Sequence, residues 1–285
     1  MVLNNKEKMK TRIISFAMGL ILFANFSNAQ VFDKIENDFN DFLKVGGDYF
    51  TAPLHFESSD WRNLGISAGV VGAGFLLDNT ARSYSQKDHA NFKDDLFDID
   101  QYYTTKYVVA ATAGIYGFGL LANNDKVRNV GVQLGESIIY AGIVTVTLKS
   151  LIGRSRPYNN KGHTSFKPFN LNNDNLSFPS GHATLAFAFS TVMAHQVDNI
   201  FWKTGWFAAA GLVCYARLYH DQHWASDVLM GGAIGYFTGR FVINHHLNNP
   251  EEKEANKNKS KPFYSVGINF RENQPVYTLN FAYQF

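Results

Sequence analysis

Six apolar segments, each rich in alanine, glycine and leucine, follow one another along most of the chain. They cover residues 63–77, 107–122, 131–152, 183–197, 204–219 and 226–243. Polar residues or turns that contain Asn or Gly separate them, which is typical of helices packed in series. The sequence therefore predicts an all-α fold, a helical bundle of about six core helices. Four small residues in the last segment would let helices approach closely: Gly231, Gly232, Gly235 and Gly239.

Residues 1–29 have the pattern of a secretory signal peptide, with a basic start, an apolar run over 13–26 and a small-residue cleavage site before Gln30. The apolar run is shorter than the ~20 residues of a membrane span, so an uncleaved anchor is the less favoured alternative. Removing these residues lowers the formal net charge from +2 to −1, because four bases and one acid are lost. The mature chain is therefore not of the basic, nucleic-acid-binding type. We expect export to the periplasm, or to the periplasmic face of a membrane, in a Gram-negative-type cell.

Residues 30–247 form the predicted helical domain, which begins with a short amphipathic helix near 32–43. After this domain the helical pattern of apolar residues ends. Residues 248–262 form a charged linker with little to bury. Apolar residues then alternate with polar or small ones over 263–285, with a turn at 271–275, and this pattern predicts a β-hairpin. An isolated hairpin is marginal in water, so we expect it to fold on the helical body or to dock on an envelope partner.

Hydropathy favours a soluble or peripheral domain over an integral one. Only one uncharged stretch, residues 107–124, reaches the ~18 residues of a span candidate, and the mean hydropathy is −0.17. Cys214 is the only cysteine, which excludes an intramolecular disulfide. The sequence contains no cysteine pair and no His-Glu-x-x-His motif, so it predicts no metal site.

Three cationic side chains stand in short motifs at or just beyond the ends of apolar segments: Lys149, Arg156 before Pro157, and Arg217. Phosphoryl transfer needs positioning and charge neutralisation around the phosphate oxygens. Arginine pairs with two oxygens at once, and lysine adds a point charge. Together they bring three positive charges against a dianionic phosphate, which requires no metal ion.

Residues 179–182, Pro-Ser-Gly-His, directly precede an apolar helix. Ser180 is a good helix-capping residue, and Gly181 permits close backbone approach to a ligand. The N–H groups at such a helix start can bind an anion. His182 is then placed to protonate the leaving alkoxide as general acid. Taken alone, the motif is equally compatible with an ordinary helix start.

His223 and Asp227 are four residues apart, so on a helix they would share one face. The carboxylate would hold one imidazole nitrogen and leave the other free to attack phosphorus. Alone, this pair would be read as a surface His–Asp pair. The combination of the three motifs makes coincidence negligible.

In chain order these residues form three motifs: Lys149-x6-Arg156-Pro157, Pro179-Ser180-Gly181-His182 and Arg217-x5-His223-x3-Asp227. They resemble the signature of the type 2 phosphatidic acid phosphatase / vanadium haloperoxidase superfamily, over roughly residues 60–245. One departure is Ala216, where the family usually has serine. The resemblance implies a helical bundle with a phosphate site at one end, where Ser180 and Gly181 assist Lys149, Arg156 and Arg217. It also implies roles for the reactive residues: His223 as phosphohistidine nucleophile, His182 as acid and later base, and Asp227 as the orienting carboxylate.

We therefore expect a metal-independent phosphatase that hydrolyses a phosphate monoester or pyrophosphate. Its substrate would be a phosphorylated lipid at a membrane surface (phosphatidate, a polyprenyl pyrophosphate or a lipid A type) or a small phosphate ester. No cofactor is expected, and vanadate would act as a phosphate-mimicking inhibitor. The alternatives are a vanadium-dependent haloperoxidase and a non-catalytic envelope protein on the same fold. Specificity is expected from the segments 158–178 and 80–106.

Overall fold

The computed structural model describes residues 28–87, 97, 105–248, 263–271 and 274–282. The predicted signal peptide lies almost entirely outside these residues, as does most of the predicted linker. The chain divides into two compact units, Met1–Val242 and Ile243–Phe285, and each is described by itself. The domain boundaries expected from the sequence stay predictions.

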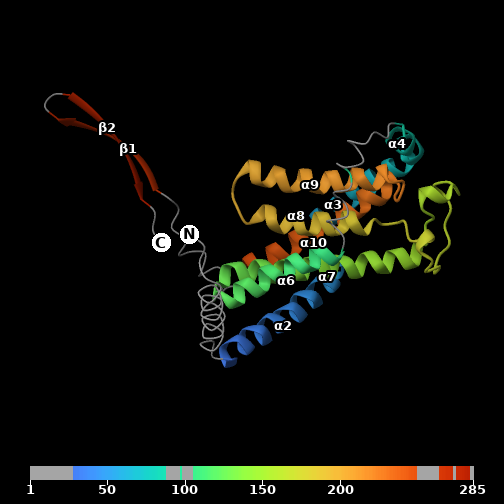
Figure 1. Ribbon diagram of the computed structural model, residues 1–285, viewed down its shortest axis with the longest axis horizontal. Helices are drawn as coiled ribbons and strands as arrows, with labels where there is room; N and C mark the ends of the chain where they lie inside the picture. The colour runs from blue at the N-terminus through green and yellow to red at the C-terminus, as the bar shows by residue number, and fades with distance from the viewer. Residues whose placement is uncertain (1–27, 88–96, 98–104, 249–262, 272–273, 283–285) are drawn as a thin grey trace, which may run out of the picture. The chain divides into compact units, whose positions relative to one another are not determined.

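The described chain is mostly helical, which confirms the predicted fold class at that level. Six α-helices match the six apolar segments: α3 (Ser58–Leu76), α6 (Thr105–Leu121), α7 (Asp125–Ile152), α8 (Gly181–His195), α9 (Ile200–Tyr219) and α10 (Ala225–Asn248). Two more are present in the described part, α2 (Asn28–Thr51) and α4 (Asp78–Ser85). Helix α7 packs against α2, α6 and α8, while α9 packs against α8 and α4 (Figure 1).

Helix α7 has defined signals at both ends. The Asn124 side chain accepts a hydrogen bond from Val127 N at 3.1 Å and caps the helix start. At the other end Gly153 has a φ of +62°, and a Cβ there would lie 1.8 Å from the Lys167 carbonyl oxygen. Only glycine fits this turn, which lets the chain leave α7 sharply and directs Arg154 into the interior.

The glycines of α10 bring this helix against α8, as the sequence predicted. A Cβ on Gly231 would lie 2.4 Å from the Ser180 carbonyl oxygen, and one on Gly235 would lie 2.3 Å from the Thr184 carbonyl oxygen. These distances are far below van der Waals contact. The close packing fixes the start of α8 relative to the start of α10.

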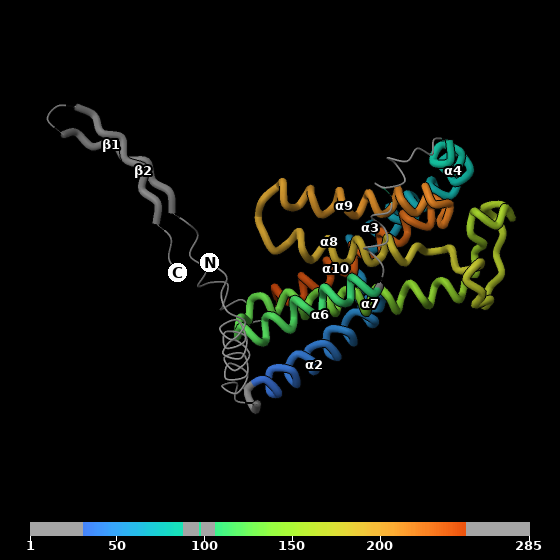
Figure 2. The backbone as a smooth tube through the Cα atoms, in the orientation of Figure 1, coloured from blue at the N-terminus to red at the C-terminus, as the bar shows by residue number. Residues whose placement is uncertain are grey.

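Large apolar side chains are exposed on several helices of the first unit. Examples are Ile66 on α3 (60% exposed), Phe118 on α6 (62%), Val146 on α7 (63%) and Phe201 on α9 (84%). Among the described helices, α7 is long and apolar enough to cross a membrane, and the bent pair α3–α4 is a second candidate. The path of these helices is traced in Figure 2.

The second unit contains two antiparallel strands, β1 (Phe263–Arg271) and β2 (Gln274–Ala282). Their register pairs Phe263 with Ala282 at one end and Arg271 with Gln274 at the other. What this segment binds stays a prediction.

Short 3-10 helices complete the described secondary structure: η1 (Ala52–His55), η3 (Pro157–Asn159) and η4 (Asn173–Asn175). The last two lie in the link between α7 and α8, which contains the segment 158–178 from which specificity is expected. The three motifs lie in that link, in the α9–α10 turn and in the adjoining ends of the helices.

Candidate phosphate site

The three motifs meet at one end of the first unit. Ser180 N donates to the Asp227 carbonyl oxygen at 2.9 Å, which ties the second motif to the third. Tyr158 N, just after Arg156-Pro157, donates to the Asp221 carbonyl oxygen at 3.2 Å, which ties the first to the third. Figure 1 shows the α7–α8 link and α4 at this end of the unit. The predicted convergence of distant segments is therefore present in the structure.

Lys149 and Arg156 approach the site from α7 and from the link that follows it. The Lys149 ammonium donates to the Leu176 carbonyl oxygen at 2.5 Å, and its Cε would lie 3.9 Å from a Cβ placed on Gly181. Arg156 donates from Nε to the Asn173 carbonyl oxygen at 2.9 Å and from Nη1 to Gln222 Oε1 at 3.1 Å. Both side chains are half-buried and held by these hydrogen bonds, so they lose little conformational freedom when a substrate binds.

Burial is the main cause that lowers the pKa of the Arg156 guanidinium, and the neighbouring charge of Arg217 acts in the same direction. Arg217 lies in the last turn of α9, and its carbonyl oxygen accepts hydrogen bonds from the backbone N–H groups of Gln222 and His223. An anion bound between these side chains would relieve their mutual repulsion.

Ser180 and Gly181 stand at the start of α8 as predicted. The Ser180 side chain caps the helix by accepting a hydrogen bond from Ala183 N at 3.4 Å. His182 is the second residue of the helix and is half-buried, whereas Ser180 is fully buried. The helix start therefore presents its N–H groups and an imidazole at the same end as the cations.

His223 is 3% exposed and lies in the turn between α9 and α10. The prediction that His223 and Asp227 share one helix face is wrong in this respect, because α10 begins only at Ala225. The two side chains are nevertheless neighbours: His223 Nδ1 lies 3.6 Å from Asp227 Oδ2. This distance is slightly longer than a hydrogen bond.

The pKa of the His223 imidazole lies well below its usual value of 6.5. Burial is the largest cause, followed by the positive charges of Lys149, Arg156 and Arg217 and by His182. The three predicted cations therefore act on the imidazole in the same direction as burial. His223 is consequently neutral at physiological pH, as a nucleophile must be.

Asp227 is completely buried, and both of its carboxylate oxygens accept hydrogen bonds. Oδ1 accepts from Arg154 Nη1 at 2.7 Å. Oδ2 accepts from Ser177 Oγ at 2.5 Å and from Trp224 N at 2.8 Å. The carboxylate plane is thereby fixed, with Oδ2 toward His223.

Sequence reasoning assigned no role to a group of residues that lies behind Asp227. Arg154 and Asp78 are both 0% exposed and pair with each other, with Arg154 Nη2 to Asp78 Oδ2 at 2.5 Å. Ser226 lies between Asp78 and Asp227 and contacts both Asp78 and Arg154. The sequence holds two signals for this group. Arg154 stands two residues before Arg156, and Asp78 directly follows the apolar segment 63–77.

Ala216, the departure from the family motif, is 0% exposed and packs in an apolar cluster with Phe97 and Tyr219. A serine hydroxyl would be buried in that cluster. Alanine is therefore compatible with the local packing.

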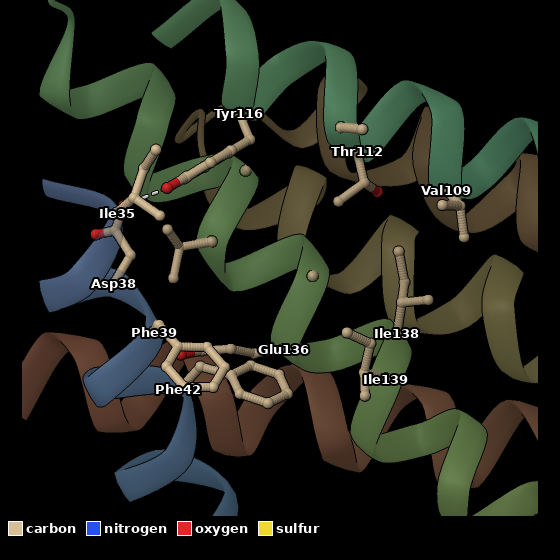
Figure 3. A pocket seen from close by; sticks show the side chains of 14 residues that line it. Ile35, Asp38, Phe39, Phe42, Val109, Thr112, Tyr116, Glu136, Ile138 and Ile139 are labelled. Carbon is tan, nitrogen blue, oxygen red and sulfur yellow. Dashed lines mark hydrogen bonds between the residues drawn. The ribbon is translucent and has the colours of Figure 1, made fainter. Parts of the chain in front are cut away.

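A separate cavity of about 390 Å³ lies between α2, α6 and α7 (Figure 3). Its lining is mainly apolar, and the polar contact within it is a hydrogen bond of 2.8 Å from the Tyr116 hydroxyl to Asp38 Oδ2. None of the predicted site residues lines this cavity. Within the part of the chain that the structure describes, no cluster of His, Cys, Asp and Glu could hold a metal ion.

Comparison with known proteins gives a consistent set of similarities. Residues 130–251, which include all the predicted site residues, match the family model described as the PAP2 superfamily. A lipid A 1-phosphatase of Rhizobium johnstonii is 32% identical over 108 residues, or 37% of this chain and 43% of that protein. An undecaprenyl-diphosphatase of Sulfolobus acidocaldarius is 26% identical over 137 residues, or 47% of this chain and 64% of that protein.

Among solved structures, the crystal structure of Aquifex aeolicus LpxE aligns with a TM-score of 0.47 and 21% identity. The alignment covers 59% of this chain and 95% of that chain. The chain spans less than two thirds of the length of the curated relatives named above.

Proposed function

We propose that this chain is a metal-independent phosphatase of the PAP2 superfamily that acts on a phosphorylated lipid, a proposal supported by the match of residues 130–251 to that family model. The observation that carries the proposal is the environment of His223. A buried imidazole with a depressed pKa stands beside a fixed carboxylate and close to the charges of three cationic side chains. This arrangement supplies a neutral nucleophile and charge neutralisation for a phosphate.

In the first step the phosphate lies among Lys149, Arg156 and Arg217. With Nδ1 directed to Asp227, Nε2 of His223 is the nitrogen that attacks phosphorus. The P–N bond forms as the P–O bond to the leaving group breaks, and His182 gives its proton to the leaving oxygen. The imidazole becomes cationic, and the adjacent Asp227 carboxylate stabilises that charge.

In the second step water attacks the phosphohistidine. His182, now neutral, takes a proton from the water as the P–O bond forms and the P–N bond breaks. The bonding electron pair returns to Nε2, inorganic phosphate leaves, and both histidines regain their starting protonation. The three cations neutralise the phosphoryl oxygens throughout, which is why no metal ion is needed.

The proposed substrate is a phosphate monoester or pyrophosphate on a lipid. Two relatives are named as a lipid A 1-phosphatase and an undecaprenyl-diphosphatase, which are both lipid-directed activities. Exposed apolar side chains on four helices, together with the span candidate α7, fit a lipid environment better than water. We propose that the first unit sits in a membrane with its phosphate site at one face, which replaces the soluble or peripheral placement that hydropathy favoured. The periplasmic face follows from the predicted signal peptide.

The test is phosphate release by the purified chain in detergent micelles containing EDTA. Phosphatidate, undecaprenyl pyrophosphate and lipid A would be supplied separately. We expect turnover of at least one lipid, inhibition by vanadate, and loss of turnover in His223→Ala. His195→Ala is the matched control, because His195 is an exposed histidine at the far end of α8.

Absence of phosphate release from all the lipids by folded protein would contradict the proposal. Bromide oxidation after addition of vanadate would then indicate the haloperoxidase alternative. Full turnover by His223→Ala would contradict the histidine mechanism.

A further inference from the structure

We propose that Arg154, anchored by Asp78 of α4, is a positioning residue that fixes the Asp227 carboxylate beside His223. The inference rests on the proposed phosphatase function and concerns Arg154 and Asp78, two residues that the three motifs do not specify. Asp78 also lies outside the region that matches the family model, residues 130–251.

The Arg154 guanidinium is fully enclosed and fully hydrogen-bonded. Nε and Nη2 both donate to the His163 carbonyl oxygen, at 2.9 and 2.7 Å. Nη1 donates to Ser226 Oγ and to Asp227 Oδ1, each at 2.7 Å, and Nη2 also donates to Asp78 Oδ2 at 2.5 Å. All five N–H groups therefore have an acceptor. Trp224, Phe75 and Phe166 surround the guanidinium, with ring centroids 4.9 to 5.7 Å from its carbon.

Stability alone is a poor explanation for this arrangement. Buried ion pairs are weak contributors to stability, because removing charges from water offsets their attraction. Here one arginine faces two buried carboxylates, so the trio carries a net negative charge. This negative charge lies next to the cationic side chains of the site, and it would stabilise the positive charge that develops on His223 during the reaction.

Asp78 connects this trio to the first turn of α10. Asp78 Oδ1 accepts a hydrogen bond from Ser226 N at 2.9 Å, and Oδ2 accepts from Ser226 Oγ at 2.9 Å. One helical turn later, Arg82 forms a bidentate pair with Asp221, at 2.7 and 2.6 Å. Helix α4 therefore holds the chain on both sides of His223, at Asp221 before it and at Ser226 after it.

The consequence for the reaction is pre-organisation. When His223 becomes cationic, Asp227 must face Nδ1 without having to rotate. Arg154 holds Oδ1 and leaves Oδ2 toward the imidazole. Loss of the guanidinium fork should therefore slow the chemical step, while substrate binding by Lys149, Arg156 and Arg217 is kept.

The experiment is a double-mutant cycle on the full chain, assayed with the lipid that the wild-type chain hydrolyses. The variants are Arg154→Lys, Asp227→Asn and the double variant. Lysine keeps the charge but cannot reproduce the five-donor fork. We expect Arg154→Lys to lower kcat at least about tenfold with little change in KM. The double variant should be no slower than Asp227→Asn alone, because Arg154 acts through Asp227.

Arg128→Lys is the matched control, because Arg128 is a largely buried arginine whose carboxylate partners, Asp38 and Asp125, lie far from the motifs in the sequence. We expect it to lower the melting temperature without lowering kcat. If Arg154→Lys does not fold, Asp78→Asn takes its place in the same cycle, since an amide keeps the acceptor for Ser226 N.

An unchanged kcat in the folded variant, or multiplicative effects of the two substitutions, would overturn the inference while leaving the phosphatase function intact. A wild-type chain without turnover would overturn the proposed function and the inference together.

Discussion

At the residue scale, the environment of His223 determines when the site can react. Burial and four nearby groups, Lys149, Arg156, Arg217 and His182, lower the pKa of this imidazole below 6.5. The neutral, nucleophilic form therefore persists into mildly acidic solution. Protonation would abolish attack, so it should appear as the acid limb of the pH–rate profile.

We expect Lys149→Met to move this acid limb of kcat/KM to higher pH. The Lys149 charge lowers the His223 pKa, so removing it raises that pKa, and His223 becomes protonated at a less acid pH. The measurement is kcat/KM against pH for the wild-type chain and the variant with the same substrate. Protonation of the substrate then affects both profiles equally. An acid limb that moves to lower pH, or does not move, would show that another group controls it.

The sequence singles out the proposed reactive residues because their spacing carries chemical meaning. It could not show how His223 and Asp227 meet. Asp227 accepts from Trp224 N, the residue just before α10, so the carboxylate helps to start this helix and keeps His223 outside it. The position of Arg154 two residues before Arg156 marks it in the sequence, but its burial against Asp78 and Asp227 depends on the fold.

At the scale of elements, α4 shows the limit of periodicity. Its eight residues, Asp78–Ser85, are largely polar and carry no apolar stripe that would signal a helix. It makes hydrogen bonds and ion pairs to the α7–α8 link, to the end of α9 and to the turn that follows α9. Gln86, just after the helix, donates to the Leu218 and Tyr219 carbonyl oxygens at 2.9 Å each. Such contacts are set by tertiary structure, so only the fold reveals them.

The α8–α10 contact gives a prediction about stability. Gly235→Ala should lower the free energy of unfolding by about 1–3 kcal/mol, because the new Cβ meets backbone atoms that cannot move away. It should also lower phosphatase activity, because α8 and α10 each begin at the site.

Gly211→Ala on α9 is the control, since no atom lies within 4 Å of its added Cβ. It should be neutral or stabilise the protein by up to about 1 kcal/mol. Thermal unfolding in detergent compares the two variants. Equal melting temperatures for both would refute the close-packing interpretation.

At the scale of the whole molecule, hydropathy alone cannot tell which apolar side chains of the helical domain lie on its surface. The apolar segments are interrupted by glycine, alanine and scattered polar residues, which lowers their mean hydropathy. Hydropathy does not say whether an apolar side chain packs on a neighbouring helix or points outward. The exposed side chains of α3, α6, α7 and α9 became visible only in three dimensions.

All the proposed site residues lie in the first unit, Met1–Val242. We therefore expect a chain that ends after Asn248 to retain kcat and KM within about twofold, since it keeps α10 complete. Activity in the same detergent, with melting temperature as the control for folding, tests this. A folded truncated protein without turnover would assign β1 and β2 a part in the reaction.

The enclosure of Arg154 has a consequence for how this chain can change over evolutionary time. Its side chain joins Asp78, Asp227 and the His163 carbonyl oxygen, which come from segments far apart in the sequence. Loss of Arg154 alone would leave two buried carboxylates facing each other. Positions 78 and 154 should therefore vary together among homologous chains, with a neutral residue at one accompanied by a neutral residue at the other.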